Sequence, residues 1–195
     1  FAQARGYGSS AEAALDSSFV PRAIYDTLVK ETRANLPTLH RYFKLRQKML
    51  GLPDLHYYDI YPALVTQKKE YSLDDAAALT LAATQPLGED YQNLLKSTFK
   101  LNTMHAMPAP GKSGGAYQDG VYGAPPFVFL NHQGEFESVS TFAHEWGHAM
   151  HTAMANRAQP YETANYSLFV AEIASTANEV LLSNYMRGQA GSKEE

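Results

Sequence analysis

Residues 137–156, ESVSTFAHEWGHAMHTAMAN, decide the fold and have the pattern of one long helix. At their centre is a His-Glu-x-x-His motif, His144-Glu145-Trp146-Gly147-His148. A helix advances about 100° per residue, so His144 and His148 lie one turn apart on one face, where both imidazoles can reach one ion. Glu145 borders that face, and we expect it to act as a catalytic base on water without ligating the metal.

The opposite face of this helix is apolar, as a helix packed against a core requires. It carries Phe142, Trp146, Met150 and Met154. A five-residue motif also arises by chance, on a helix whose histidines only satisfy hydrogen bonds in the core. A metal site therefore needs a third ligand.

Glu172 supplies that ligand within the apolar run LFVAEIA, residues 168–174. A carboxylate in such a run is costly to bury unless a cation or hydrogen bonds compensate it. The interval after His148 allows a second helix, expected over residues 165–186, to return alongside the first. We therefore predict that His144, His148 and Glu172 bind one Zn²⁺, with the fourth position open for water as in catalytic zinc sites.

Two further side chains lie near the predicted ligands. Glu179 follows Glu172 at an interval that keeps both on one helix face, so it is a candidate hydrogen-bond partner for a ligand imidazole. An ordinary surface carboxylate fits the spacing equally well. His151 lies about 10 Å along the helix axis from His144, too far to complete the site. We expect His151 to support the site or the packing around it.

Composition excludes several classes of site and partner. The chain has 195 residues, no Cys, and 16 Lys and Arg against 20 Asp and Glu, for a net charge of -4. Thiolate ligands, disulfides and a cysteine nucleophile are absent. The acidic balance argues against nucleic-acid binding, and the basic residues Arg41, Lys44, Arg46 and Lys48 have the helical spacing of a solvated face. No apolar run is long enough to span a membrane, so no membrane partner is expected.

The remaining sequence predicts a mainly α fold with a small antiparallel β-sheet beside the metal-binding helix. Residues 1–100 are expected to be helical, with one bent or two separate helices over 21–50 and a helix capped by Ser72. Residues 101–136 are rich in Gly and Pro and predict loops and short strands, and residues 137–190 predict the two metal-binding helices. The strand Phe127–Leu130 is expected to pair with an edge over Gly114–Tyr117.

The glycine-rich segment of this region has two candidate roles. Gly114, Gly115 and Ala116 suit an edge strand that pairs with an extended peptide substrate, although a flexible hairpin explains them equally well. Gly111-Lys112-Ser113 looks like the end of a phosphate-binding loop, but Ala106 stands where that motif requires glycine. Nucleotide binding is therefore not expected.

The segments HEWGHAMH (144–151) and AEIASTANE (171–179) together resemble the oligopeptidase F branch of the thimet oligopeptidase family of zinc metallopeptidases. The segment LHYYDIY (55–61) and residues 111–134 extend the resemblance upstream. It implies a zincin-like helical metallopeptidase fold, zinc imidazoles at His144 and His148, the general base at Glu145 and the third ligand at Glu172. Trp146 departs from the smaller residue that is usual at its position.

The resemblance implies an endopeptidase that hydrolyses short unstructured oligopeptides in the cytoplasm, although the sequence also allows a leader that has been removed. In that family a histidine and a tyrosine that stabilise the tetrahedral intermediate lie beyond the third ligand, and no such pair follows Glu172 here. We therefore expect residues 1–195 to be part of one metallopeptidase catalytic domain, cut at both ends, with the remainder of that domain as a candidate partner. The alternatives are a catalytically incomplete fragment that binds zinc and peptide, or another helical zincin such as a carboxypeptidase.

Overall fold

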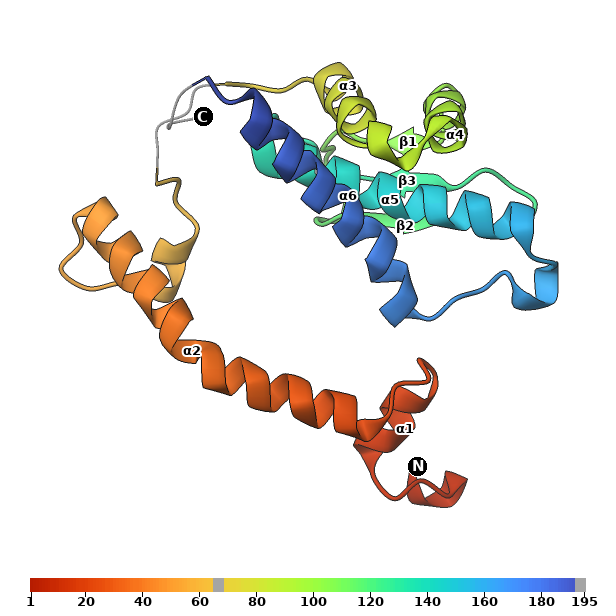
Figure 1. Cartoon of the computed structure of the whole chain (residues 1–195), viewed down its shortest axis with the longest axis horizontal. Coiled ribbons are helices and arrows are strands. Elements are labelled where there is room, and N and C mark those ends of the chain that lie inside the picture. The colour runs from red at the N-terminus through yellow and green to blue at the C-terminus, as the bar shows by residue number, and fades with distance from the viewer. Residues whose placement is uncertain (65–68, 192–195) are drawn as a thin grey trace. The chain divides into compact units, whose positions relative to one another are not determined.

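A computed structural model describes residues 1–64 and 69–191 of the chain (Figure 1). The chain divides into two compact units, Phe1–Gln67 and Lys68–Glu195, which are described separately. None of the described helices combines the length and the apolar character that a membrane crossing needs.

The first unit is built around one long helix, α2. Its elements are η1 (Gln3–Arg5), α1 (Ser10–Asp16), α2 (Arg22–Leu50) and η2 (Tyr57–Ile60). Helix α2 is continuous through Pro37, so the expected alternative of two separate helices is wrong. It ends at Gly51, whose φ of 66° is the left-handed conformation that commonly closes a helix.

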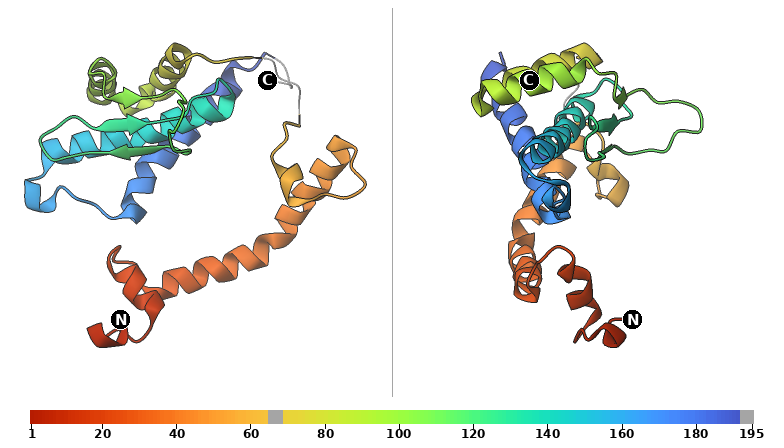
Figure 2. Two further views of the ribbon diagram at one scale, coloured as in Figure 1. Left: turned by 180° about the vertical axis from the view of Figure 1, so that it is seen from behind. Right: turned by 90° about the vertical axis from the view of Figure 1, so that its right-hand side faces the viewer.

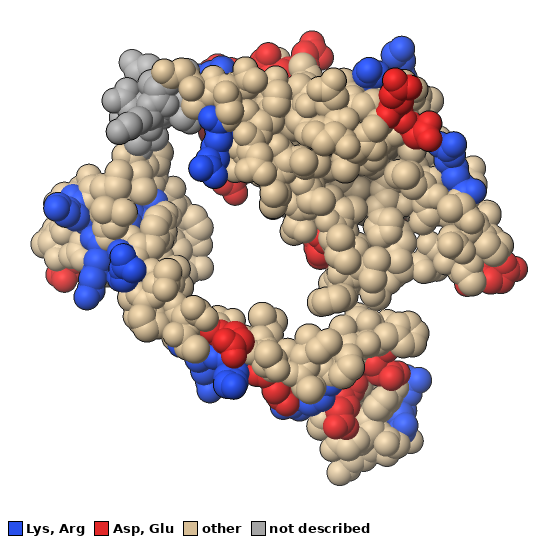
Figure 3. Space-filling model, viewed as in Figure 1, with Lys and Arg blue, Asp and Glu red and all other residues tan. Residues whose placement is uncertain are grey.

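The basic residues of α2 do not form the fully solvated face that their spacing predicted. In Figure 3 the Lys and Arg side chains of this unit are spread along it, with one group near the C-terminal end of α2. Arg46 is nevertheless buried, because its guanidinium donates to the backbone oxygens of Asp59 and Pro62. These hydrogen bonds of the Arg46 guanidinium thus hold η2 and the following turn against α2.

The second unit contains most of the helices and the only sheet of the described residues. Its elements are α3 (Leu73–Ala83), η3 (Gln85–Leu87), α4 (Glu89–Phe99), β1 (Met104–His105), β2 (Tyr117–Asp119), β3 (Phe127–Phe129), α5 (Phe136–Ala158), η4 (Tyr161–Thr163) and α6 (Leu168–Gln189). Ser72 caps α3 as predicted: its Oγ accepts from the Asp75 amide at 3.1 Å, and the Asp75 carboxylate accepts from the Ser72 amide at 2.8 Å. The predicted mainly α fold with a small sheet is confirmed.

The sheet lies beside α5 (Figure 2), and it is mixed rather than purely antiparallel. Its order is β1-β3-β2, with β2 antiparallel to β3 and β1 parallel to β3. The predicted edge strand is shifted: β2 begins at Tyr117, and Gly114 to Ala116 form a loop before it. Gly115 has a φ of 83°, which is incompatible with an extended strand.

Lys112 holds the loop that precedes β2. Its ammonium donates to the backbone oxygens of His105 at 3.1 Å, Met107 at 2.8 Å and Leu130, and lies 4.4 Å from the centre of the Phe129 ring. The lysine that resembled a phosphate-binding residue is therefore used to close the loop onto the sheet.

The core of this unit lies on the apolar face of α5. Phe142 and Trp146 are 1% exposed and Met150 is fully buried, as predicted. The Trp146 ring packs edge-on against Phe99 of α4, with centroids 4.6 Å apart. Met154 is 45% exposed, so its predicted place in the core is wrong, because the buried part of α5 ends at Thr152.

Candidate metal centre

Helices α5 and α6 bring the three predicted ligands together. His144 and His148 project from α5 with their Nε2 atoms 3.1 Å apart. Glu172 of α6 places Oε2 at 3.5 Å from His144 Nε2 and 3.6 Å from His148 Nε2. Two imidazoles of α5 and a carboxylate 24 residues farther along the chain thus converge on one point.

The triangle of these three atoms has the dimensions of a metal site. Tetrahedral zinc with bonds of about 2.0–2.2 Å to N and O places neighbouring ligand atoms about 3.3–3.6 Å apart. The observed separations are 3.1, 3.5 and 3.6 Å. Two imidazole nitrogens that face each other gain little from direct contact, whereas a cation between them would satisfy both lone pairs. The donor set therefore fits a divalent metal ion.

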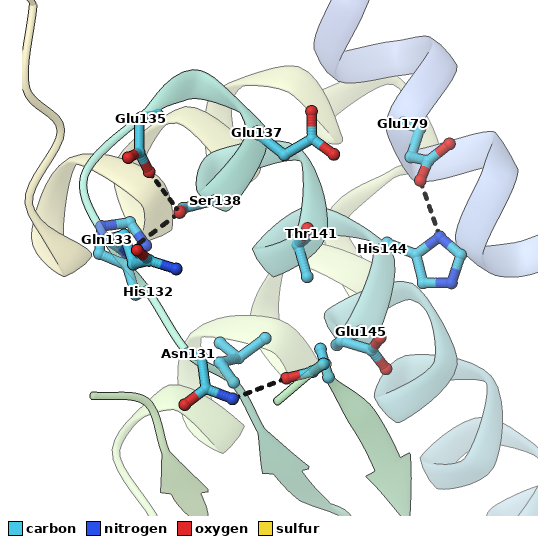
Figure 4. A pocket seen from close by; sticks show the side chains of 13 residues that line it. Asn131, His132, Gln133, Glu135, Glu137, Ser138, Thr141, His144, Glu145 and Glu179 are labelled. Carbon is cyan, nitrogen blue, oxygen red and sulfur yellow. Dashed lines mark hydrogen bonds and ion pairs between the residues drawn. The ribbon is translucent and has the colours of Figure 1, made fainter. Parts of the chain in front are cut away.

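Hydrogen bonds from α6 orient two of the three ligands. His144 Nδ1 lies 2.8 Å from Glu179 Oε1 (Figure 4), and a proton on Nδ1 donated to this carboxylate leaves the Nε2 lone pair directed at the cluster. Ser175 Oγ donates to Glu172 Oε2 at 2.8 Å. The structure thus brings Glu179 to the predicted imidazole, and it adds Ser175, whose hydroxyl fixes the carboxylate.

Gly147 allows α6 to approach α5 at this point. A Cβ at Gly147 would lie 2.8 Å from the Ala174 carbonyl oxygen and 2.9 Å from Ser175 Cα. Both are backbone atoms that a side-chain rotation cannot move aside. Sequence reasoning missed this role, although a glycine inside a helix, where it costs about 0.5–1 kcal/mol relative to alanine, was a signal of close packing.

Glu145 lies in a cavity beside the cluster. The cavity has a volume of about 470 Å³, and His144, Glu179, Gly115 and Ala116 also line it. Glu145 is 6% exposed, and its Oε2 has no hydrogen-bond partner among the described residues. Burial raises the pKa of the Glu145 carboxyl, and the Glu172 charge adds to the rise while His144 opposes it. A carboxylate with a raised pKa is better matched to proton transfer near neutral pH.

The two other histidines of α5, His148 and His151, differ in their surroundings. Burial lowers the pKa of His148, and the nearby His144 lowers it further, which favours the neutral imidazole that binds metal. His151 lies outside the cluster of three ligands, with its ring stacked on Tyr166 at a centroid distance of 3.8 Å. Burial also lowers the pKa of His151.

The predicted peptide-binding segment reaches the cavity only in part. Gly115 and Ala116 line it, whereas Gly114 is not among its lining residues. Asn131 Nδ2 donates to the backbone oxygens of Ser113 and Gly115, both at 2.9 Å. Each of these oxygens thus already accepts one hydrogen bond, and peptide binding by Gly114, Gly115 and Ala116 stays a prediction.

The structure has a zincin-like helical metallopeptidase fold. A helix with a His-Glu-x-x-His motif lies beside a small sheet, and the next helix adds a carboxylate. The chain belongs to peptidase family M3, whose sequence profile matches residues 1–195.

Individual relatives agree with this family. The chain is 39% identical to oligopeptidase PepF of Bacillus subtilis over 187 residues, which covers 95% of this chain and 28% of that protein. It is 36% identical to the chromosomal oligoendopeptidase F of Lactococcus lactis subsp. cremoris over 194 residues, covering 100% of this chain and 32% of the relative. The chain thus spans less than a third of the length of these relatives.

Solved structures share the fold. A crystal structure from Chlamydophila abortus matches with a TM-score of 0.80 and 36% identity, covering 99% of this chain and 32% of that one. Oligoendopeptidase-F from Enterococcus faecium matches with a TM-score of 0.60 and 27% identity, covering 99% of this chain and 26% of that chain.

Proposed function

We propose that this chain carries the metal-binding centre of a zinc-dependent endopeptidase that hydrolyses short unstructured peptides. The observation that carries the proposal is the convergence of His144, His148 and Glu172 beside the buried Glu145. Membership of peptidase family M3 and similarity to oligoendopeptidases support the peptide substrate. The cytoplasm as the place of action rests on the family resemblance alone.

In this proposal His144, His148 and Glu172 hold the zinc ion. When bound, such an ion supplies Lewis acidity, which polarises a carbonyl oxygen and lowers the pKa of water. Glu145 accepts a proton from the attacking water and returns it to the leaving amine. Its buried position favours this exchange, because desolvation weakens the carboxyl group as an acid and so strengthens the carboxylate as a base.

The surrounding residues position the reacting groups. Glu179 sets the tautomer of His144, and Ser175 fixes the rotation of the Glu172 carboxylate. The loop around Gly115 and Ala116 forms a wall of the cavity next to Glu145, where the substrate backbone would pass. His151 keeps the packing role that its stack on Tyr166 supports.

Replacing Glu145→Gln tests the assigned base. The neutral amide has the same shape but cannot take the proton, so we expect kcat/KM for an internally quenched peptide to fall by about 10²- to 10⁴-fold. Zinc content, measured by elemental mass spectrometry, should stay at the wild-type level. The matched control is Glu31→Gln on the exposed surface of α2, which should leave both values unchanged.

Three results would contradict the proposal. Undiminished cleavage by the Glu145→Gln variant would remove Glu145 from its role. Cleavage only of the C-terminal residue, with blocked peptides left intact, would favour a carboxypeptidase. Stoichiometric zinc without turnover in the wild-type protein would favour the non-catalytic, zinc- and peptide-binding alternative.

A further inference from the structure

The cavity beside Glu145 carries more negative charge than the proposed chemistry needs. Its lining includes no Lys or Arg among the described residues. The two imidazoles that line it are both hydrogen-bonded, His132 to the backbone oxygen of Tyr71 and His144 to Glu179. Four carboxylates line the same cavity, from Glu135, Glu137, Glu145 and Glu179. The lining therefore lacks a fixed cation that would match these charges.

Glu137 is an exposed carboxylate of this lining without a partner. Glu179 already lies 2.8 Å from a ligand imidazole, and Glu135 Oε2 accepts from Ser138 Oγ at 3.3 Å. The Glu137 carboxylate makes no hydrogen bond or ion pair with the described residues, and in the view of Figure 4 it lies between Glu135 and Glu179. Both Glu135 and Glu137 are exposed, so a bound molecule can reach them.

Glu137 lies on the same face of α5 as the ligand histidines. It precedes His144 by seven residues, so the two side chains are about 20° apart around the helix axis and about 10 Å apart along it. Thr141, which lies between them on this face, also lines the cavity. An extended peptide advances about 3.3 Å per residue. A peptide with its cleaved bond beside Glu145 can therefore place a side chain against Glu137 roughly two to three residues away.

A second observation connects this acidic wall with a ligand. The cavity also contains Glu145, which is 6% exposed and whose Oε2 has no hydrogen-bond partner among the described residues. A concave surface with charges of one sign focuses its field on the molecule that enters it. An acidic side chain would be repelled there. A Lys or Arg side chain, in contrast, can lay its apolar stem along the cavity and bring its charge to Glu137.

We propose that Glu137, assisted by Glu135, forms a specificity subsite that binds a Lys or Arg side chain of the peptide. The subsite lies on the side of the cleaved bond that extends toward the N-terminal end of α5. The inference rests on the proposed peptidase function and names the class of peptide that this site prefers. Peptides with a basic residue roughly two to three positions from the cleaved bond on that side should bind best.

Glu137 also stabilises its own helix, and a matched residue separates this role from binding. Glu137 lies in the first turn of α5, where a negative charge interacts favourably with the helix dipole. Glu89 lies in the first turn of α4, is exposed, and is not among the residues that line the cavity. Glu89→Gln therefore removes a charge of the same kind without altering the cavity.

A peptide-binding experiment tests the subsite without relying on turnover. The intact protein with Glu145→Gln is titrated with fluorescently labelled peptides that are blocked at both ends and in which one Lys is moved along the sequence. Norleucine, which has a stem like that of Lys without the charge, is the reference at each position. We expect Lys to bind about three- to fivefold more tightly at one or two neighbouring positions, the range of an exposed ion pair. Adding Glu137→Gln should remove this preference, whereas adding Glu89→Gln should preserve it.

Two further measurements separate a charge contact from a structural role of Glu137. Glu137→Lys should invert the selectivity, so that a peptide with Glu at the preferred position binds more tightly than the same peptide with Gln. Raising the ionic strength from about 0.1 M to about 1 M shortens the Debye length from about 10 Å to about 3 Å, and should weaken the preference for Lys. A merely structural role would produce neither result.

Equal affinity for Lys and norleucine at every position would overturn the subsite. A preference that survives Glu137→Gln, or that Glu89→Gln also removes, would overturn it as well. Cleavage by the wild-type protein without any preference for Lys would remove the subsite alone. A preference for Lys without any cleavage by the wild-type protein would remove the proposed hydrolysis alone, and the absence of any peptide binding would overturn both.

Discussion

Helices α2 and α5 are both long and both evident from the sequence, yet they differ in how many of their residues are buried. Helix α2 has 29 residues and buries only Arg46 among them, whereas α5 has 23 residues and buries nine. Leu28 of α2 is 64% exposed, whereas Trp146 of α5 is 1% exposed. Helical periodicity therefore predicts that a segment is a helix, but contacts within its unit decide which side chains carry stability and chemistry.

The largest expected difference between the two helices is in core packing. Trp146→Ala should lower the free energy of unfolding of the second unit by about 3–5 kcal/mol, because a large buried ring leaves a cavity. Leu28→Ala should change the stability of the first unit by less than about 1 kcal/mol, because the side chain is mostly solvated already. Urea unfolding followed by circular dichroism measures both. Equal losses would show that α2 is as deeply packed as α5.

A smaller effect is expected where α5 meets α6. Gly147→Ala should destabilise the second unit by about 1–3 kcal/mol, because the added methyl meets the backbone of Ala174 and Ser175. It should also weaken zinc binding by moving Glu172 away from the imidazoles. Gly188→Ala on α6 is the matched control, because a Cβ there meets no atom within 4 Å. That control should be neutral or stabilising by up to about 1 kcal/mol, and a similar loss in both variants would argue against a tight crossing.

The smallest effect concerns pH. Burial lowers the pKa of His148, so the metal-free folded protein keeps this imidazole neutral where the unfolded chain is protonated. The resulting destabilisation is absent above about pH 6.5 and grows as pH falls toward the folded pKa. Zinc affinity should fall over the same range, by up to about tenfold per pH unit for each imidazole that takes up a proton.

A histidine on α2 provides the control for this pH dependence. His40→Asn on the exposed surface of that helix should leave the pH dependence of zinc binding unchanged in a chelator competition assay. Affinity that stays constant down to about pH 4 would contradict imidazole ligation, because the reference pKa of His is about 6.5.

Much of the site could be predicted because its residues obey local rules. The helical spacing of His144 and His148 and the apolar run around Glu172 were sufficient to select the three side chains that the structure brings together. The cap of α3 was also predictable, because Ser72 and Asp75 interact within one turn. The assignment of His144, His148 and Glu172 as metal ligands stays a proposal. The assignment of residues 1–195 to one catalytic domain also stays a proposal.

Other features depend on contacts that a linear pattern does not contain. The parallel pairing of β1 with β3 joins two segments that Lys112 also bridges, because its ammonium donates to the backbone oxygens of His105 and Leu130. The burial of Arg46 depends on backbone oxygens of a later turn. The missing hydrogen-bond partner of Gln118 Nε2 is evident only from the structure, in which Thr152 donates to the amide oxygen of Gln118 and contacts the Tyr166 hydroxyl. In each case the partner lies on another element.

The most direct test of the central claim is the zinc content of the intact protein after dialysis, measured by elemental mass spectrometry. If His144, His148 and Glu172 hold the ion, the wild-type protein should retain one zinc per chain. His148→Asn and Glu172→Gln should lose it, while His40→Asn and Glu31→Gln keep it. Full zinc retention by either ligand variant, or no zinc in the wild-type protein, would contradict the account.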